Sequence, residues 1–481
     1  MISQDLMAPI MFGGLIVFLL IGYPAAFSLG AVGLFFSFIG IEMGMFQPTF
    51  LQALPDRVFG ILSNDLLLSI PFFTFMGAIL EKCGLAEDML EGLGQLFGPI
   101  RGGLAYAVII VGAILGAITG TVAASVIAMG LISLPIMLRY GYNPRVATGV
   151  IAASGTITQL IPPSLVLIVL ADQLGKSVGD MYAGAIGPSI IQIILFCLFI
   201  LFLSIFRPQD VPALPPEARP KIDWKLFKKI LWGIVPSIAL IFLVLGTILM
   251  GLATPTEGGA MGSVGALVLA AMNGRLQKTL VWDAMTSTMR INAMVIFILI
   301  GSTVFGLAFR GVDGDLWIEH LLSGLPGGQV GFLIVVNLFV FFLAFFLDYF
   351  EIAFIIIPLL APVAQKLGID LIWFGVLLGA NMQTSFMHPP FGFALFYLRG
   401  VAPKSVKSSD IYYGALPWVG LQLILVAIII FVPETVTYFI DKPAIAVDAN
   451  AISVDPLAGV EQNEITVDSS SEIERQLREN K

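Results

Sequence analysis

The sequence predicts an all-helical protein that crosses a membrane many times. Of its 481 residues, 58% are hydrophobic and 12% are charged, and the charged share is about half that of a typical soluble domain. The mean hydropathy is +0.97. The apolar residues form long continuous runs, whereas the strands of a membrane β-barrel alternate apolar and polar residues. We therefore expect a bundle of membrane helices rather than a soluble domain or a barrel.

Twelve apolar segments follow one another along the chain, and most approach the length of about 20 residues that a membrane helix needs. They lie near 6–21, 24–40, 65–83, 104–138, 144–171, 184–206, 230–252, 256–273, 288–307, 329–366, 371–398 and 412–434. Segments 104–138 and 329–366 are too long for one span and too short for two spans with a loop. Each therefore predicts a re-entrant hairpin.

Charge and proline divide the chain into four parts. Residues 207–229 contain five prolines and six basic residues against three acidic ones, which predicts a cytoplasmic linker by the positive-inside rule. Residues 1–206 and 230–434 are then two halves. Residues 435–481 form a tail whose part 441–481 has nine acidic and four basic residues. Its polar composition predicts disorder.

The two halves resemble each other in their glycines and prolines. One constant shift aligns Pro135, Gly141, Pro162 and Pro163 with Pro362, Gly368, Pro389 and Pro390. A slightly longer shift aligns the segment that starts at Asp180 with the one that starts at Asp410. Gly and Pro mark special backbone geometry, so these matches indicate a repeat. We expect the repeats to be inverted, although sequence alone does not distinguish inverted from parallel repeats.

One segment in each half reads as a broken membrane helix. The first, 149–172, contains Ser154, Thr156 and Thr158 before Pro162 and Pro163; the second, 371–398, contains Asn381, Thr384, Ser385 and His388 before Pro389 and Pro390. A proline pair interrupts helical hydrogen bonding. A broken helix at membrane depth occurs only inside protein or beside a watery cavity. Paired breaks in equivalent places point to the substrate site of a secondary transporter.

The chemistry of two facing breaks favours an anion that moves together with a cation. Exposed carbonyl and hydroxyl oxygens suit a small hard cation such as Na⁺. The N-termini of half-helices offer N–H donors and partial positive charge, which suit a carboxylate. Further polar groups lie in the two expected hairpins, at Thr119–Thr121 and Ser125 in the first and at Asp348 and Glu351 in the second.

Enzymatic function is not expected. The chain has two cysteines and two histidines and contains no HExxH, GxSxG or Walker A motif, so neither hydrolytic chemistry nor ATP drive is encoded in it. Simpler interpretations of single residues also stand. Ser and Thr often pack membrane helices together, Glu257 could bond backbone groups freed by Pro255, and Asp348 and Glu351 could pair with a basic residue of another helix.

Four motifs carry a resemblance to a known family. GAITGTVAASVIAMGLISLP, LIPPS, GLATPTEGGA and HPPFGFALFYL are similar to the large membrane subunit, DctM type, of tripartite ATP-independent periplasmic (TRAP) transporters. The resemblance covers roughly residues 6–434. It implies a fold of the elevator-type ion transporter superfamily, with inverted repeats, two re-entrant hairpins and broken helices.

The resemblance also implies function. It implies Na⁺-coupled uptake of a carboxylate, a small four-helix membrane subunit, a periplasmic substrate-binding protein, and a multi-pass location in a bacterial inner membrane. No nucleic-acid partner is expected. The alternative is a stand-alone anion symporter or exchanger of related architecture, which would transport when reconstituted alone.

Site residues follow from matching the family's motifs. The first ion site would use Gly120, Thr121, Thr158, Ile161 and Pro163, and the second would use Asp348, Ser385 and His388. The substrate would lie between them, near Ser125, Ser154, Thr156, Asn381 and Thr384. Relatives often have Thr where His388 stands. A histidine there could ligate the ion through its imidazole or make the site sensitive to protons.

Overall fold

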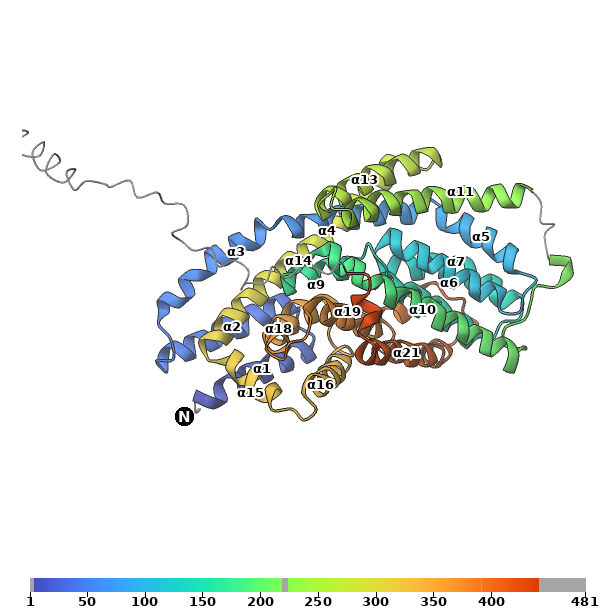
Figure 1. The fold of residues 1–481 in the computed structure, drawn as a ribbon. Helices are drawn as coiled ribbons and strands as arrows, with labels where there is room; N and C mark the ends of the chain where they lie inside the picture. The colour runs from blue at the N-terminus through green and yellow to red at the C-terminus, as the bar shows by residue number, and fades with distance from the viewer. Residues whose placement is uncertain (1–3, 219–223, 391, 441–481) are drawn as a thin grey trace, which may run out of the picture. The chain divides into compact units, whose positions relative to one another are not determined.

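The computed structural model describes residues 4–218, 224–390 and 392–440, and within them every regular element is helical (Figure 1). Seven of the described helices are long and apolar enough to cross a membrane, or up to nine if each of two bent helix pairs counts as one span. The all-helical, multi-pass class is therefore confirmed. The expected disorder of 441–481 lies outside the described residues.

The described part of the first half contains ten α-helices. They are α1 (Gln4–Ile21), α2 (Ala25–Glu42), α3 (Leu54–Leu62), α4 (Asp65–Lys82), α5 (Leu85–Phe97), α6 (Gly103–Thr119), α7 (Val122–Arg139), α8 (Pro144–Thr156), α9 (Leu165–Leu174) and α10 (Val178–Phe206). A 3₁₀ turn, η2 (Ile157–Gln159), follows α8 directly.

The described part of the second half contains twelve α-helices. They are α11 (Trp224–Ile241), α12 (Thr247–Leu249), α13 (Pro255–Met272), α14 (Lys278–Gly311), α15 (Gly314–Ser323), α16 (Gly328–Leu343), α17 (Tyr349–Glu351), α18 (Ile357–Lys366), α19 (Leu371–Met382), α20 (Phe393–Val401), α21 (Ser408–Phe431) and α22 (Glu434–Thr437). Two π-helical turns, η4 (Phe242–Gly246) and η5 (Ile352–Ile356), and a 3₁₀ turn, η6 (Gln383–Phe386), lie between them. Residues 435–481 were expected to form the tail. Because α22 covers the first of them, the helical fold continues into the start of that segment.

Two helical hairpins occupy the long apolar segments. In the first, α6 ends at Gly120, whose φ of +61° belongs to the left-handed region that a glycine adopts without strain. Thr121 then starts α7 in an extended conformation. In the second, α16 is followed by a turn to Asp348, which starts α17. We call Gly120–Thr121 and Asp348–Tyr349 the two hairpin tips.

Each broken segment consists of two half-helices. In the first, α8 passes into η2 and the chain then turns through the proline pair to α9. Ser164 caps α9 by accepting a hydrogen bond from the Val166 N–H at 3.2 Å, and its own hydroxyl donates to the Gln159 carbonyl. In the second, α19 passes into η6 and the chain turns to α20. The prolines end each first half-helix because they lack the N–H that would continue it.

The two halves are inserted in opposite directions. The start of α8 lies beside the linker, because Asn143 Nδ2 donates to Asp210 at 3.0 Å. The second hairpin enters from the other end. There Leu174 at the end of α9 packs against Gly375 in the first turns of α19, and Gln329 Nε2 at the start of α16 donates to the Leu367 carbonyl at 2.7 Å, just before α19. The first hairpin and α8 therefore start at the linker end, whereas the second hairpin and α19 start at the opposite end.

The halves interlock through equivalent glycines. Gly149 of α8 packs against the backbone of Gly414 in α21, and Gly184 of α10 packs against Ile372 in α19. Gly184 and Gly414 match under the same shift that aligns Asp180 with Asp410. The first half-helix of each break is thus supported by the last long helix of the other half.

A second group of helices forms a frame beside the hairpins. The frame consists of α2, α3, α4, α13 and α14, which pack along one another. Hydrogen bonds fix the register of α4 against α13: the hydroxyl of Thr256 donates to the Asp65 carbonyl at 2.7 Å and that of Ser263 to the Phe72 carbonyl at 2.8 Å. Both helices therefore run in the same direction.

Candidate functional site

Both hairpin tips and both breaks meet at one cavity of about 290 Å³. The first tip and the residues that follow it form one wall, and the second tip forms another. The lining residues are Gly120, Thr121, Val122, Ala123, Gln159, Leu165, Val166, Ile291, Met294, Asp348, Tyr349, Phe350, Phe386, Phe393 and Tyr397. We call this space the tip cavity. Residues of both halves that are distant in the chain meet at this cavity. The repeat predicts that the two breaks face each other, but it does not predict which residues line the space.

Four helices begin at the tip cavity, and each contributes residues of its first turn to the lining. They are α7, α9, α17 and α20. The N-termini of α7 and α20 have no side-chain cap, so the first N–H groups of both helices are open to a ligand. A helix N-terminus carries roughly half a positive charge. Because the described lining contains neither Lys nor Arg, these backbone ends are its source of positive potential.

Asp348 is the one charged side chain in the described lining of the tip cavity. Its Oδ1 accepts a hydrogen bond from the Glu351 N–H at 2.8 Å, while Glu351 Oε2 accepts from the Asp348 N–H at 2.9 Å. This reciprocal capping box satisfies two backbone donors at the start of α17. The two carboxylates therefore stabilise the second tip by capping. The other interpretation from the sequence, pairing with a basic residue of another helix, is not seen in the described chain.

Three of the five residues expected at the first ion site line one pocket, and the other two do not. Gly120, Thr121 and Pro163 line a narrow pocket beside the tip cavity, next to Phe73 and Thr74 of α4. Thr158 lies in η2, where its hydroxyl donates to the Gly155 carbonyl at 3.0 Å. Its Cα is so close to Gly116 of α6 that a Cβ at Gly116 would come within 2.9 Å. Ile161 is half-buried between η2 and the proline pair.

The residues expected at the second ion site are more dispersed. The Ser385 hydroxyl donates to the Met382 carbonyl at 2.7 Å within η6. The His388 ring stacks on Phe345 with centroids 4.0 Å apart and lies edge-on to Phe341 at 4.4 Å. The Ala344 backbone faces this ring, but neither ring nitrogen forms a hydrogen bond of good geometry with the described chain. Unlike Asp348, neither residue lines the tip cavity.

The five residues expected near the substrate are all buried and none lines the tip cavity. Ser154 packs against Gly112 of α6. Asn381 Nδ2 donates to the Asn337 carbonyl at 2.7 Å and thereby joins the second hairpin to the second break. The Thr384 hydroxyl donates to the Asn381 carbonyl at 2.7 Å, and Ser125 is buried in α7. In this arrangement these residues hold the half-helices in place behind the cavity wall.

Two glutamines brace the breaks from the opposite half. Gln192 Nε2 of α10 donates to Gln383 Oε1 of η6 at 2.7 Å, and Gln422 Nε2 of α21 donates to Thr156 Oγ1 at 3.0 Å. Gln192 and Gln422 occupy equivalent places in the two repeats, and so do Thr156 and Gln383. All four side chains are buried. We call these contacts the glutamine braces.

Sequence reasoning missed several residues of the cavity wall. Gln159 and Phe386 belong to the breaks, so their place in the cavity follows from the breaks themselves. Tyr397, Ile291 and Met294 carried no signal, because an apolar or aromatic residue in a membrane helix is ordinary packing material. Within the described residues, no three His, Cys, Asp or Glu side chains gather as a metal cluster.

Inverted halves, paired breaks and a central cavity define a multi-pass membrane protein of the secondary-transporter class. The model of the family "Tripartite ATP-independent periplasmic transporter, DctM component" matches residues 12–435. The chain therefore belongs to this family, whose members are large permease subunits of TRAP transporters. It is not an enzyme.

Individual relatives agree with this assignment. The C4-dicarboxylate TRAP transporter large permease protein DctM of Rhodobacter capsulatus is 29% identical over 445 residues, which cover 89% of this chain and 97% of that protein. The isethionate TRAP transporter permease protein DctMQ of Oleidesulfovibrio alaskensis is 26% identical over 432 residues, covering 90% of this chain and 66% of that protein. Among solved structures, the Alcanivorax borkumensis YdaH transporter matches the fold with a TM-score of 0.56 at 16% identity, covering 79% of this chain and 86% of that chain.

Proposed function

We propose that this permease takes up a small organic anion with a carboxylate group, together with Na⁺, through the tip cavity. The observation that supports the proposal most directly is the convergence of four helix N-termini on a cavity whose described lining has no basic side chain. Such N-termini bind carboxylate oxygens through N–H groups. The C4-dicarboxylate named for the Rhodobacter relative is an anion of this kind.

Na⁺ is proposed as the second cargo. Its first site would use Gly120, Thr121, Thr158, Ile161 and Pro163, and its second site would use Asp348, Ser385 and His388. The carbonyl ends freed by each break are hard oxygen ligands, and Asp348 adds a negative charge to the wall of the tip cavity. The substrate would be held near Ser125, Ser154, Thr156, Asn381 and Thr384 once the tips rearrange around it.

Transport is proposed to require movement of the hairpins and broken helices as one unit against the frame. Both tips and both breaks line the same cavity, so a movement of one changes the environment of all four. A gradient drives such a cycle only if ion and substrate together favour the loaded state over the half-loaded states.

The proposed partners are a small four-helix membrane subunit and a periplasmic protein that delivers the substrate, in a bacterial inner membrane. The alternative is a carrier that works alone. The test is uptake into proteoliposomes under an inward Na⁺ gradient, with the carboxylates succinate and sialic acid as probes and the sulfonate isethionate for comparison. We expect uptake of at least one probe only when both partners and Na⁺ are present. Uptake by the chain alone would support the alternative. Uptake at the same rate without Na⁺ would overturn the proposed Na⁺ coupling.

A further inference from the structure

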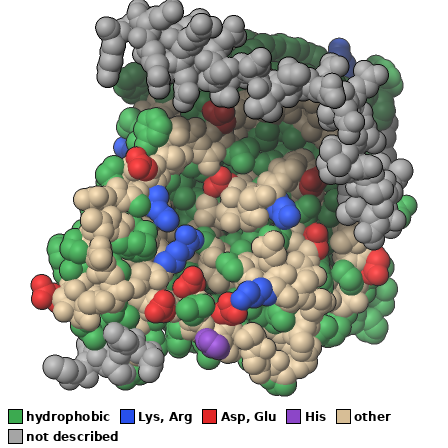
Figure 2. All heavy atoms as spheres, turned by 60° about the vertical axis from the view of Figure 1, so that its left-hand side comes forward, with side chains coloured by type: hydrophobic (Ala, Val, Ile, Leu, Met, Phe, Trp, Pro, Cys, Tyr) green, Lys and Arg blue, Asp and Glu red, His purple; other side chains and the backbone are tan. Residues whose placement is uncertain are grey.

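A second and larger cavity lies between the frame and the second hairpin, with a volume of about 610 Å³. Its walls are α3 and α14 on the frame side and η5, α18 and the end of α9 on the other. We call it the vestibule. It lies at the end of the molecule opposite the basic linker, because Asp172 at the end of α9 and Asn64 at the start of α4 line it. Seen from the side that carries α3 and α15, basic and acidic side chains gather on this face (Figure 2).

The vestibule and the tip cavity follow one another along the same two elements. Along α14, the tip cavity is lined by Ile291 and Met294 and the vestibule by residues from Leu299 to Arg310. Along the second hairpin, the tip cavity is lined by Asp348–Phe350 and the vestibule by residues from Phe354 to Val363. A helix rises about 1.5 Å per residue, so Arg310 lies roughly 24 Å along α14 from Met294. The tip cavity and the vestibule therefore lie one after the other between α14 and the second hairpin.

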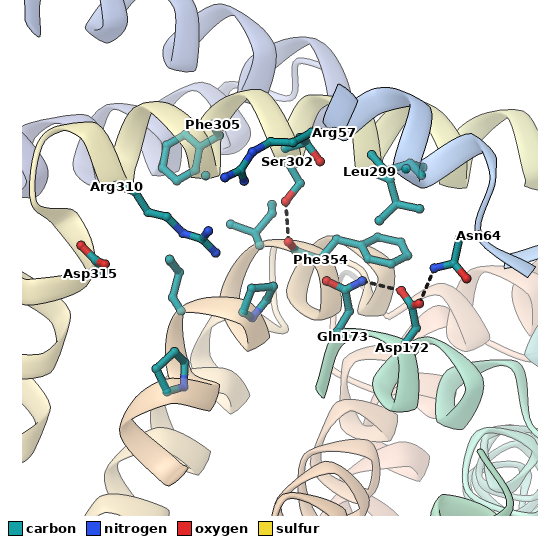
Figure 3. A pocket seen from close by; sticks show the side chains of 18 of the residues that line it. Arg57, Asn64, Asp172, Gln173, Leu299, Ser302, Phe305, Arg310, Asp315 and Phe354 are labelled. Carbon is teal, nitrogen blue, oxygen red and sulfur yellow. Dashed lines mark hydrogen bonds between the residues drawn. The ribbon is translucent and has the colours of Figure 1, made fainter. Parts of the chain in front are cut away.

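Two arginines extend into the vestibule. Arg57 comes from α3 and Arg310 from the last turn of α14, and their guanidinium groups point toward one another across the pocket (Figure 3). The ion pairs of the described chain join other residues. Two positive groups that face each other without an intervening carboxylate repel, and an anion between them relieves that repulsion.

The acidic residues of the vestibule are engaged or turned elsewhere. Asp172 accepts hydrogen bonds from Asn64 Nδ2 at 2.7 Å and from Gln173 Nε2 at 2.8 Å. Glu319 pairs with Lys366. Asp315 lies on the far side of Arg310 from Arg57 in Figure 3. Asp172 and Glu319 are therefore held by other partners, and Asp315 does not lie between the two guanidinium groups, so an anion placed there would meet N–H donors.

We infer that Arg57 and Arg310 form an anion-capture site, which holds the carboxylate of the transported organic anion before it reaches the tip cavity. A guanidinium group is always charged and presents paired N–H donors that match both oxygens of a carboxylate. Both arginines sit on the frame, whereas the opposite wall belongs to the hairpin unit. The anion would thus dock on the frame and pass to the hairpin. This inference rests on the proposed transport of an organic anion.

The test places a reporter thiol in the vestibule. Gly306 lines the vestibule, and a Cβ there would meet nothing within 4 Å, so Gly306→Cys is expected to fold. The full chain in proteoliposomes is treated with a negatively charged or a positively charged methanethiosulfonate reagent. The labelling of the parent chain, which contains only Cys83 and Cys197, is subtracted. We expect Arg57→Gln and Arg310→Gln each to lower the ratio of anionic to cationic labelling rates by about threefold or more.

Matched variants separate charge from geometry. Arg139→Gln, at the linker end of α7, removes the same charge far from the vestibule and should leave the ratio unchanged. Arg57→Lys and Arg310→Lys should keep the ratio because they keep the charge. Millimolar succinate should slow labelling in the arginine-containing protein more than neutral succinamide does. In the Arg57→Gln/Arg310→Gln protein this difference should disappear, and in the lysine variants it should shrink because the paired donors are lost.

Three results would overturn the capture site: an unchanged rate ratio in both glutamine variants, no protection by succinate in the arginine-containing protein, or equal protection after both arginines are replaced. Uptake is measured in parallel. If labelling changes as expected but no probe is taken up even when both partners and Na⁺ are present, the proposed function fails. The anion site in the vestibule then still stands. If uptake is normal in both glutamine variants and labelling is unaffected, only the capture site fails.

Discussion

His388 illustrates how one residue changes meaning once its neighbours are known. In the sequence it sits before a proline pair, among residues expected to hold an ion. In the structure its ring is enclosed by Phe341 and Phe345, and neither ring nitrogen is hydrogen-bonded within the described chain. A buried polar atom without a partner costs free energy. The aromatic rings therefore hold the imidazole in place, and its nitrogens remain open to the proposed ion.

We predict that His388→Phe raises the Na⁺ concentration needed for half-maximal uptake, because it removes the imidazole from the proposed second ion site. The same change should raise the free energy of unfolding by about 1 kcal/mol, because it removes two unsatisfied nitrogens from an aromatic stack. Uptake at varied Na⁺ concentration and thermal unfolding in detergent measure the two effects. Ser385→Ala serves as the comparison at the same proposed ion site. An unchanged Na⁺ dependence in His388→Phe would show that the imidazole only packs against the aromatic rings and does not ligate the ion.

Single polar residues near the breaks have two possible uses that the sequence does not separate. Thr156, Asn381 and Thr384 were expected to face the substrate, yet they bond neighbouring helices or their own backbone. A hydroxyl in a membrane helix bonds a carbonyl one turn away as readily as it binds a ligand. Spacing along the chain does not tell these two uses apart, because it does not give the direction of the side chain.

At the scale of helices, the glutamine braces connect each break to the other half. Gln192 and Gln422 were not singled out in the sequence, since a lone glutamine in an apolar helix has no spacing partner nearby. Their partners, Gln383 and Thr156, lie 191 and 266 residues away in the chain. Each brace reaches the point where helical hydrogen bonding is interrupted, so it fixes the orientation of the half-helices there.

We predict that Gln192→Leu and Gln422→Leu each lower the free energy of unfolding by about 1–3 kcal/mol, because the partner at the break is left buried and unsatisfied. Thermal unfolding and uptake rates measure the effect. The double variant Gln192→Leu/Gln383→Leu removes both partners and should lose less than the sum of the two single losses. Gln52→Leu, at an exposed position, is the control. Additive losses in the double variant would contradict the brace.

The elements themselves were largely predictable. Proline pairs mark the breaks, and small residues mark the first tip, because these residue types restrict or free the backbone in known ways. The second tip was less clear, since Asp348 and Glu351 could equally well pair with a basic residue of another helix. Their capping box becomes evident only when the helix start is placed at Tyr349. The full length of α14, which begins well before the expected apolar segment, was hidden by its polar first turns.

At the scale of the molecule, the frame and the hairpin unit touch along α14 and η5. The Ser302 hydroxyl donates to the Phe354 carbonyl at this contact. Within the frame, the Ser263 hydroxyl makes an equivalent bond to the Phe72 carbonyl. The two contacts have the same chemistry, and only the first lies between parts that are proposed to move relative to each other.

We predict that joining cysteines at Ser302→Cys and Phe354→Cys with a short bifunctional thiol reagent stops uptake and that reduction restores it, because the link holds the hairpin unit to the frame. Uptake before and after reduction measures the effect. The pair Ser263→Cys and Phe72→Cys is the matched control and should transport with or without the link. Full transport by the linked 302–354 protein would contradict sliding at this contact.

The exchange of supports between the halves has a consequence for how such a chain can be assembled. Because α8 rests on α21 and α19 rests on α10, a fragment cut at the linker would leave a face of each central helix uncovered. Two fragments would have to find each other in the bilayer before either became compact. A protein made of a single repeat could bury the same faces only by pairing with a copy of itself inserted upside down.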